Sequence, residues 1–135
     1  MKATLRLCIV GALWYMAATQ RTPAQNIDEM LGQVEQAIGR NDAQTLARFF
    51  NHHVEITILD KEDTYPKNQA VFVVKEFFMN YPPRGFRFIH KGHSSDTYYA
   101  VGRYTSTRGI FDANVFIRKN GTIFAIEQLR FEQGK

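Results

Sequence analysis

The C-terminal half of the chain alternates apolar and polar residues from Phe86 to Phe131, and turn signals divide this stretch. Asn120-Gly121 is the strongest signal, because these two residue types readily adopt the positive φ angles of a type I′ hairpin turn. Thr107-Arg108-Gly109-Ile110 and Ser95-Asp96 indicate two further turns. The sequence therefore predicts four consecutive antiparallel strands.

Helical periodicity precedes these strands. Asn26 and Glu29 form a capping-box pattern at the start of an apolar stripe that stops at Gly39. A second, short helix is expected to begin near Asn41-Asp42. Residues 53–59 then alternate as a strand does.

A third helix is expected after a loop at residues 60–63. Pro66 suits its first turn, and Tyr81-Pro82-Pro83 ends it. The order of elements is thus helix, helix, strand, helix and four strands. This order predicts an α+β domain with helices on one face of a sheet.

The N-terminal segment has the features of a secretory signal peptide. A basic start is followed by an apolar run that ends at Ala18, and then by small and polar residues. The run is shorter than the about 20 residues that cross a bilayer. We expect residues 1–24 to be a signal peptide cleaved after Ala24, with Ala18 or Thr19 as alternative sites. Residues 25–135 then form one domain, exported to the periplasm or secreted.

Loss of residues 1–24 changes the chemistry of the chain. The 17 basic and 13 acidic residues become 14 and 13, because Lys2, Arg6 and Arg21 are removed, so the net charge becomes +1. Cys8, the only cysteine, is removed too. Since this cysteine lies inside the apolar run, it cannot be the first residue after cleavage, where a lipid would be attached. We expect a soluble product with no disulfide and no membrane anchor.

Residues 84–91, RGFRFIHK, resemble the aromatic strand motif of RNA-binding RRM domains. An RRM places this strand third in a βαββαβ chain, whereas the order predicted here is different. A domain that binds nucleic acid also needs a basic excess, which residues 25–135 lack. We therefore expect no nucleic-acid partner, and Phe86 and Phe88 to face the core together.

Four stretches together resemble the nuclear transport factor 2-like (cystatin-like) superfamily: AIGRNDAQTLARFFNHHVEITI, YPKNQAVFVVKEFF, HKGHSSDTYYAVGRYTSTRGIF and IEQLRFE. More narrowly, residues 26–132 are similar to a family of short exported proteins from Bacteroidetes-type bacteria, a domain of unknown function. The resemblance implies a cone-shaped α+β fold in which three N-terminal helices pack on a curved antiparallel sheet. It implies no activity. Pro66 departs from the family pattern, where a serine is expected to cap the third helix.

The polar residues give no strong catalytic or metal site. His52 and His53 are adjacent, and His90 and His93 are three apart, so on strands neither pair shares a face. Residues 60–63 lack the alternating acids and central glycine of a calcium loop. We expect no metal, no cofactor and no catalytic residue.

Some enzymes of the superfamily work inside the cone with an Asp base and Tyr donors, parts for which Asp60 and Tyr104 are candidates. A core or rim position for Tyr104 is the preferred interpretation.

The predicted hairpin turns Arg108-Gly109 and Asn120-Gly121 set the alternation of the last three strands. The face expected to lie under the helices is mainly apolar, and its polar members gather at one end. We interpret this end as the rim of a ligand-binding opening, formed by Tyr104, Ser106, Gln128 and Arg130. Mutual pairing of these side chains, or pairing of Arg130 with an acid of the first helix, is the alternative.

The opposite face mixes charged residues with apolar ones. Tyr99, Val101, Phe116 and Leu129 are expected on it, which is too apolar for a purely solvated surface. These four residues predict a homodimer interface.

Three functions are consistent with the sequence. The preferred one is a non-enzymatic domain that binds a small apolar ligand or a protein partner. The alternatives are a cone-cavity enzyme of the isomerase, dehydratase or hydrolase type acting on a small hydrophobic substrate, and a structural oligomerisation module. An enzyme requires an ionisable group buried in the cone, whereas a binder needs only a polar rim.

Overall fold

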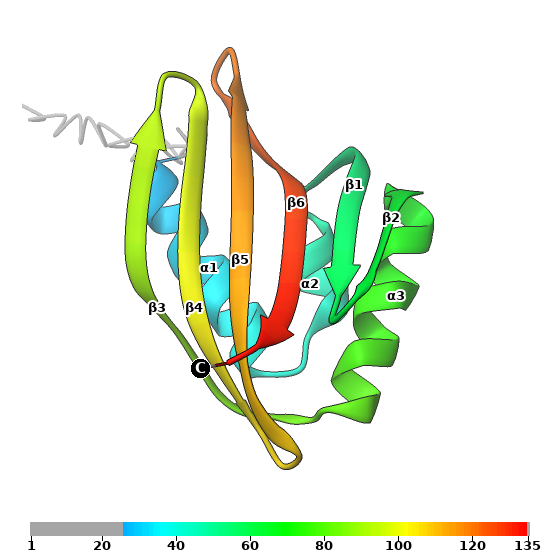
Figure 1. Ribbon diagram of the computed structural model, residues 1–135. Coiled ribbons are helices and arrows are strands. Elements are labelled where there is room, and N and C mark those ends of the chain that lie inside the picture. Colours follow the sequence, from blue (N-terminus) through cyan, green and yellow to red (C-terminus); the bar gives the residue numbers. More distant parts are fainter. Residues whose placement is uncertain (1–25, 135) are drawn as a thin grey trace, which may run out of the picture.

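Three helices lie behind one curved sheet of six strands (Figure 1). The computed structural model describes residues 26–134, so the predicted signal peptide lies outside the described residues. The strand order is β2-β1-β6-β5-β4-β3. The elements are α1 (Ile27–Gly39), α2 (Ala43–Ala47), β1 (Phe50–Ile58), β2 (Lys61–Pro66), α3 (Lys67–Asn80), β3 (Pro83–Ser94), β4 (Thr97–Ser106), β5 (Gly109–Asn120) and β6 (Ile123–Gln133).

Capping side chains determine where α1 and α2 begin. Asn26 Oδ1 accepts a hydrogen bond from the Asp28 N–H at 2.9 Å, which confirms the predicted start of α1. Asp42 accepts from the backbone N–H of Thr45 at 3.0 Å and from its hydroxyl at 2.7 Å. These two bonds hold the pKa of Asp42 below its ordinary value. Between the helices the chain turns through Asn41, which has a φ of 61°.

Two features of the predicted sheet are wrong. Residues 60–63 do not form a loop, because Lys61–Pro66 pairs with β1 in a hairpin that turns at Leu59-Asp60. This hairpin stands between α2 and α3, so the helices do not all precede the sheet, and α2 is short. The sheet is also not wholly antiparallel, because β1 runs parallel to β6.

The register of β6 corrects the predicted faces. Both turns lie one residue from their predicted places, at Thr107-Arg108 and Gly121-Thr122, and this leaves the alternation of β4 and β5 as predicted. In β6, however, Ile126 pairs with Ile117 and Gln128 with Phe116, so Glu127 is an extra residue in a β-bulge.

Beyond the bulge the faces of β6 are exchanged. Leu129 and Phe131 lie under the helices with 0% exposure. Gln128 and Arg130, predicted to lie there, lie on the other face instead. We call the two sides of the sheet the covered face, which the helices pack against, and the open face.

Aromatic side chains fill the covered face at the end where α3 stops. Phe77 of α3 stacks on Phe131 with ring centroids 4.2 Å apart, and it also contacts Tyr104 and Phe111. The ring of Phe86 lies over Gly102, where a Cβ atom would stand 2.4 Å from ring carbons. Only glycine leaves room for this ring, which fixes β3 against β4.

The edge strand β3 is tied to α1 by a side chain. Glu35 Oε2 accepts a hydrogen bond from the backbone N–H of Phe88 at 2.8 Å. Phe86 and Phe88 pack edge-on against each other beside the core, with ring centroids 5.0 Å apart. They therefore face the core together, as predicted, and do not present the open aromatic platform that an RRM requires.

Candidate functional site

A cleft opens between α3 and the β1–β2 hairpin. These elements lie side by side at the right of Figure 1. Its volume is about 200 Å³. The walls are mainly apolar, and three polar side chains complete them. The lining residues are Ile56, Ile58, Lys61, Tyr65, Val73, Glu76, Phe77, Asn80 and Tyr81.

The periodicities of β1 and α3 bring the apolar lining side chains together. Ile56 and Ile58 are two apart on β1 and therefore point to the same face of the sheet. Val73, Phe77 and Tyr81 are four apart, so they form one stripe along α3 and its C-cap. Strand and helix each contribute an apolar row, and the cleft is the space left between the rows.

The first turn of α3 lacks a side-chain cap. Pro66 is the N-cap residue and forms no capping hydrogen bond, which agrees with the departure noted in the sequence. Pro66 also ends β2, so the hairpin passes directly into α3. This short connection holds the start of the helix beside the hairpin.

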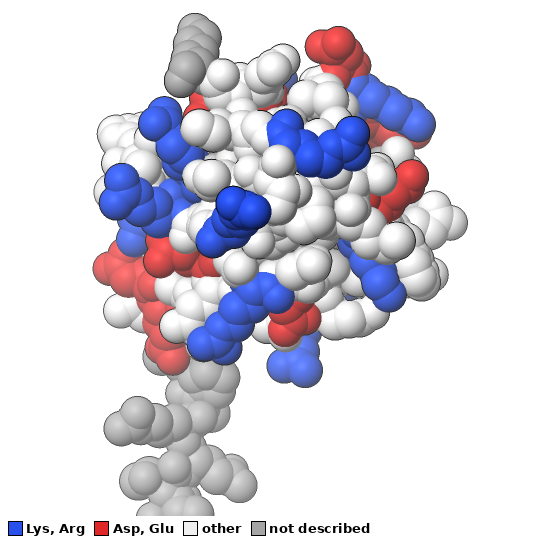
Figure 2. Space-filling view, turned by 90° about the horizontal axis from the view of Figure 1, so that it is seen from below, with Lys and Arg blue, Asp and Glu red and all other residues white. Residues whose placement is uncertain are grey.

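The polar rim of the cleft comes from Lys61, Glu76 and Asn80. Among residues 26–134 no ion pair involves Lys61 or Glu76, so both charges are available. The backbone oxygen of Asn80 accepts a hydrogen bond from Arg108 Nη1 at 3.3 Å, and the Arg108 guanidinium lies 5.7 Å from the centre of the Tyr81 ring. Figure 2 views the molecule from this end, and basic side chains spread over its middle.

The four predicted ligand-binding residues do not form one cluster. Tyr104 and Ser106 lie on the covered face, where both have internal partners. The Tyr104 hydroxyl donates to the backbone oxygen of Tyr81, and the Ser106 hydroxyl donates to that of Gly109 at 2.7 Å. Burial raises the pKa of the Tyr104 phenol, so this group stays neutral.

Gln128 and Arg130 lie on the open face because of the bulge at Glu127. Arg130 Nη2 pairs with Glu132 Oε1 at 2.9 Å, and not with an acid of α1. The predicted rim of one opening is therefore wrong.

Three of the four predicted interface residues lie on the open face. Tyr99 pairs directly with Phe116 across β4 and β5, and Val101 lies two residues further along β4. All three are half-buried. Leu129 does not join them, because it is fully buried on the covered face.

The family model of a domain of unknown function (DUF4783) matches residues 31–132. The chain belongs to this family. No curated protein matches it. A DUF4783 family protein from Bacteroides uniformis ATCC 8492 has a TM-score of 0.74 and 24% sequence identity, over 82% of this chain and 99% of that chain.

Other solved structures share the fold. A DUF4783 family protein from Bacteroides ovatus ATCC 8483 has a TM-score of 0.73 and 24% identity, over 76% of this chain and 94% of that chain. An NTF2-like protein of unknown function from Shewanella oneidensis MR-1 has a TM-score of 0.59 and 16% identity, over 82% of this chain and 99% of that one. The nuclear transport factor 2-like architecture expected from the sequence is thus the fold of this DUF4783 domain.

No metal cluster of three or more His, Cys, Asp or Glu residues occurs between residues 26 and 134 of this DUF4783 chain. The four histidines are all exposed. In the same range no helix is long and apolar enough to cross a membrane. Asp60 is exposed in the β1–β2 turn, whereas Tyr104 is fully buried.

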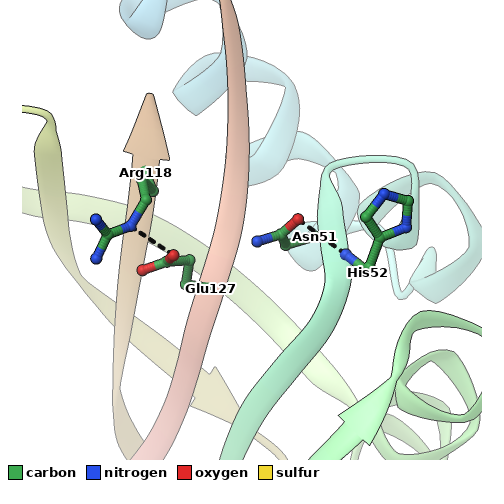
Figure 3. Close-up of polar contacts among 4 residues, drawn as sticks. All are labelled: Asn51, His52, Arg118 and Glu127. Carbon is green, nitrogen blue, oxygen red and sulfur yellow. Dashed lines mark hydrogen bonds and ion pairs between the residues drawn. The ribbon is translucent and has the colours of Figure 1, made fainter. Parts of the chain in front are cut away.

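Two local polar contacts accompany the bulge in β6. Arg118 Nε and Glu127 Oε1 form an ion pair 2.6 Å long between β5 and β6 (Figure 3). Opposite this bulge, residues 51–54 of β1 do not pair with β6. There the Asn51 side chain accepts from the His52 N–H at 2.9 Å, which satisfies a backbone group that the ladder does not.

The sequence did not reveal the cleft because it did not reveal β2. Lys61 and Tyr65 reach the cleft only because residues 61–66 form a strand. The segment KEDTYP is polar and half of its residues are charged, which is typical of a loop. The one available signal was the pair Thr64-Tyr65, two residue types common in strands.

Proposed function

We propose that this DUF4783 domain is a non-enzymatic binding protein that holds a small, mainly apolar ligand in the cleft between α3 and the β1–β2 hairpin. The observation that carries the proposal is the cleft itself, with its two apolar rows and its polar rim. Small-molecule sites are concave and mostly apolar, with a few polar groups that fix the orientation of the ligand. This cleft has each of these properties.

The size of the cleft limits the ligand. An apolar cavity of roughly 150 Å³ accepts benzene in another protein, and this cleft measures about 200 Å³. The ligand is therefore the size of one ring with a short substituent. Lys61 and Glu76 carry opposite charges at the rim, so a polar group on that substituent finds a partner of either sign.

Binding is favoured over catalysis by the side chains of the interior. The buried polar side chains of residues 26–134 are Thr57 and Ser106, together with the Tyr104 phenol. Tyr104 already donates to Tyr81, and Ser106 donates to Gly109. A cone-cavity enzyme needs an acid or base held inside the cavity, whereas Tyr104 and Ser106 are engaged in the fold and Lys61 and Glu76 lie exposed at the rim.

Ligand binding is tested by NMR with benzoate and benzylamine as probes. Both probes should shift the methyl signals of Ile56, Ile58 and Val73, and their relative affinity should show whether Lys61 or Glu76 orients the polar group. A Val73→Phe variant should fill the cleft and weaken binding at least about tenfold. Met79→Phe is the matched control, because Met79 is 70% exposed on the same helix. Equal binding of the probes by both variants, or the absence of methyl shifts, would refute ligand binding in the cleft.

We also propose that the chain is exported and that residues 1–24 are removed. The basic, apolar and small-residue regions of this segment support the proposal. The intact mass of the protein secreted or released from the periplasm should correspond to a chain that starts at Gln25. Full-length chain held in membranes would contradict it.

A second copy of the chain is the protein partner that we propose. Tyr99, Val101 and Phe116 on the open face support a homodimer, since apolar residues grouped on an uncovered face mark association sites. Phe116→Glu should give a folded monomer in light scattering. A parent protein that is monomeric at high concentration would rule out the dimer, and with it the oligomerisation role.

A further inference from the structure

Four charged side chains form a row across the open face. They lie on the adjacent strands β3, β4, β5 and β6, and each residue is paired with the next: Arg87 with Arg103, Arg103 with Asp112, and Asp112 with Glu132. In this order their charges are positive, positive, negative and negative. We call these four residues the charged row.

Within one chain the charged row is poorly compensated. Arg87 directly opposes Arg103, and Asp112 directly opposes Glu132, so two of its three pairings bring like charges together. Like charges opposed on neighbouring strands destabilise a sheet. Among the described residues the row has one ion pair with an outside residue, between Glu132 and Arg130.

An apolar patch, formed by Tyr99, Val101 and Phe116, lies beside the charged row. Tyr99 pairs with Phe116, and the Tyr99 ring reaches over Gly92 of β3, where a Cβ atom would stand 2.3 Å from the Tyr99 hydroxyl. That hydroxyl lies 3.5 Å from His90 Nε2. The Tyr99 ring is therefore held in place before any partner arrives.

From the order of charges in the row we propose that the second copy docks face to face about a two-fold axis that runs along the strands, between β4 and β5. This inference rests on the homodimer proposed above. Such an axis reverses the order of the strands but keeps each residue at its level along them. Arg87 of one copy then meets Glu132 of the other, and Arg103 meets Asp112.

The same axis also matches the apolar patch. It places the Tyr99 position of one copy at the level of Phe116 of the other, so that both apolar side chains lie within an isologous interface. A two-fold axis across the strands would lay each residue of the row over its own copy, arginine over arginine and acid over acid. The order of charges thus selects between the two arrangements, because buried like charges are costly.

Charge reversal on each half of the row tests the arrangement. Arg103→Glu and Asp112→Arg should each weaken the homodimer at least about tenfold in sedimentation at low salt. An equimolar mixture of the two variants should recover the parent affinity as a heterodimer, because every pair across the axis is again opposite in charge. Salt should weaken the parent dimer. Arg48→Glu, an exposed position on the helix side, is the matched control and should change nothing.

The outcomes separate this inference from the homodimer on which it rests. A parent that is monomeric overturns both. A parent dimer that Phe116→Glu dissociates but that neither charge variant weakens leaves the homodimer standing and overturns the two-fold arrangement. A parent dimer that salt strengthens also overturns it, because that response indicates like charges facing one another.

Discussion

Tyr104 offers a direct measure of how the covered face is held together. Its side chain is fully buried, and its ring contacts the rings of Phe77, Phe78 and Phe131. Its hydroxyl donates to the backbone oxygen of Tyr81, the residue that ends α3. The ring and the hydroxyl therefore make separate contributions, which two substitutions can measure.

Tyr104→Phe removes the hydroxyl alone. A net hydrogen bond contributes about 1 kcal/mol, and Tyr81 is half-buried, so water can replace part of the loss. We expect a decrease in the free energy of unfolding of about 1 kcal/mol and a melting temperature lower by roughly 4 °C. Tyr104→Ala also removes the ring and should cost about 3–5 kcal/mol, which is a large part of the 5–15 kcal/mol typical of a domain.

The pH dependence gives an independent check on the same side chain. Burial raises the pKa of Tyr104 above its ordinary value of 10.0, so the folded chain keeps this proton longer than the unfolded chain does. Stability should therefore fall as the pH rises above 10.0 in the parent, and Tyr104→Phe should reduce that slope.

Urea unfolding followed by circular dichroism gives the free energy of unfolding of the parent, Tyr104→Phe and Tyr104→Ala. Phe72→Leu, at a position that is 65% exposed on α3, is the control and should leave it unchanged. If Tyr104→Ala costs less than about 1 kcal/mol, the ring is not part of the core and the packing described here is wrong.

Three further predictions concern single residues. Leu59 has a φ of 55° in the β1–β2 turn, a conformation that costs a residue with a Cβ roughly 1–2 kcal/mol. Leu59→Gly should therefore raise the free energy of unfolding by about 1 kcal/mol. An unchanged free energy of unfolding in urea would show that the turn is unstrained. A hydrogen bond with Glu62, then burial and then the Glu62 charge raise the pKa of Glu55, so stability is lost as the pH rises through and above 4.5. Glu55→Gln should therefore raise the melting temperature at about pH 7 and not at about pH 4. Gly102→Ala should cost roughly 1–3 kcal/mol, because the new methyl group meets the Phe86 ring, and an unchanged melting temperature would argue against that contact.

The parts of the fold with strong local signals could be predicted from the sequence. The cap at Asn26, the stop at Tyr81 and the alternation of β4 and β5 all follow from residue types acting on their own backbone. The order of elements predicted helices on one face of a sheet, and the family resemblance added the curvature of that sheet. For these elements the local preference and the tertiary structure agree.

The errors occur where tertiary pairing overrides the local pattern. β2 is polar and exposed, and it exists because it pairs with β1. The bulge at Glu127 has no glycine or proline to mark it, yet this one extra residue exchanges the faces of Gln128 and Leu129. Since side chains alternate along a strand, a shift of one residue moves every later side chain to the other face. For this reason Gln128 and Arg130 do not lie at the predicted rim, and Leu129 does not lie on the predicted interface.

Native mass spectrometry of the protein purified from its own host tests ligand binding in the cleft most directly. The parent should carry a co-purified small molecule, lost on mild activation, at a stoichiometry of one per chain. Val73→Phe should carry none, whereas Met79→Phe should carry as much as the parent. Equal occupancy in the two variants, or a parent that never carries a small molecule, would contradict the account.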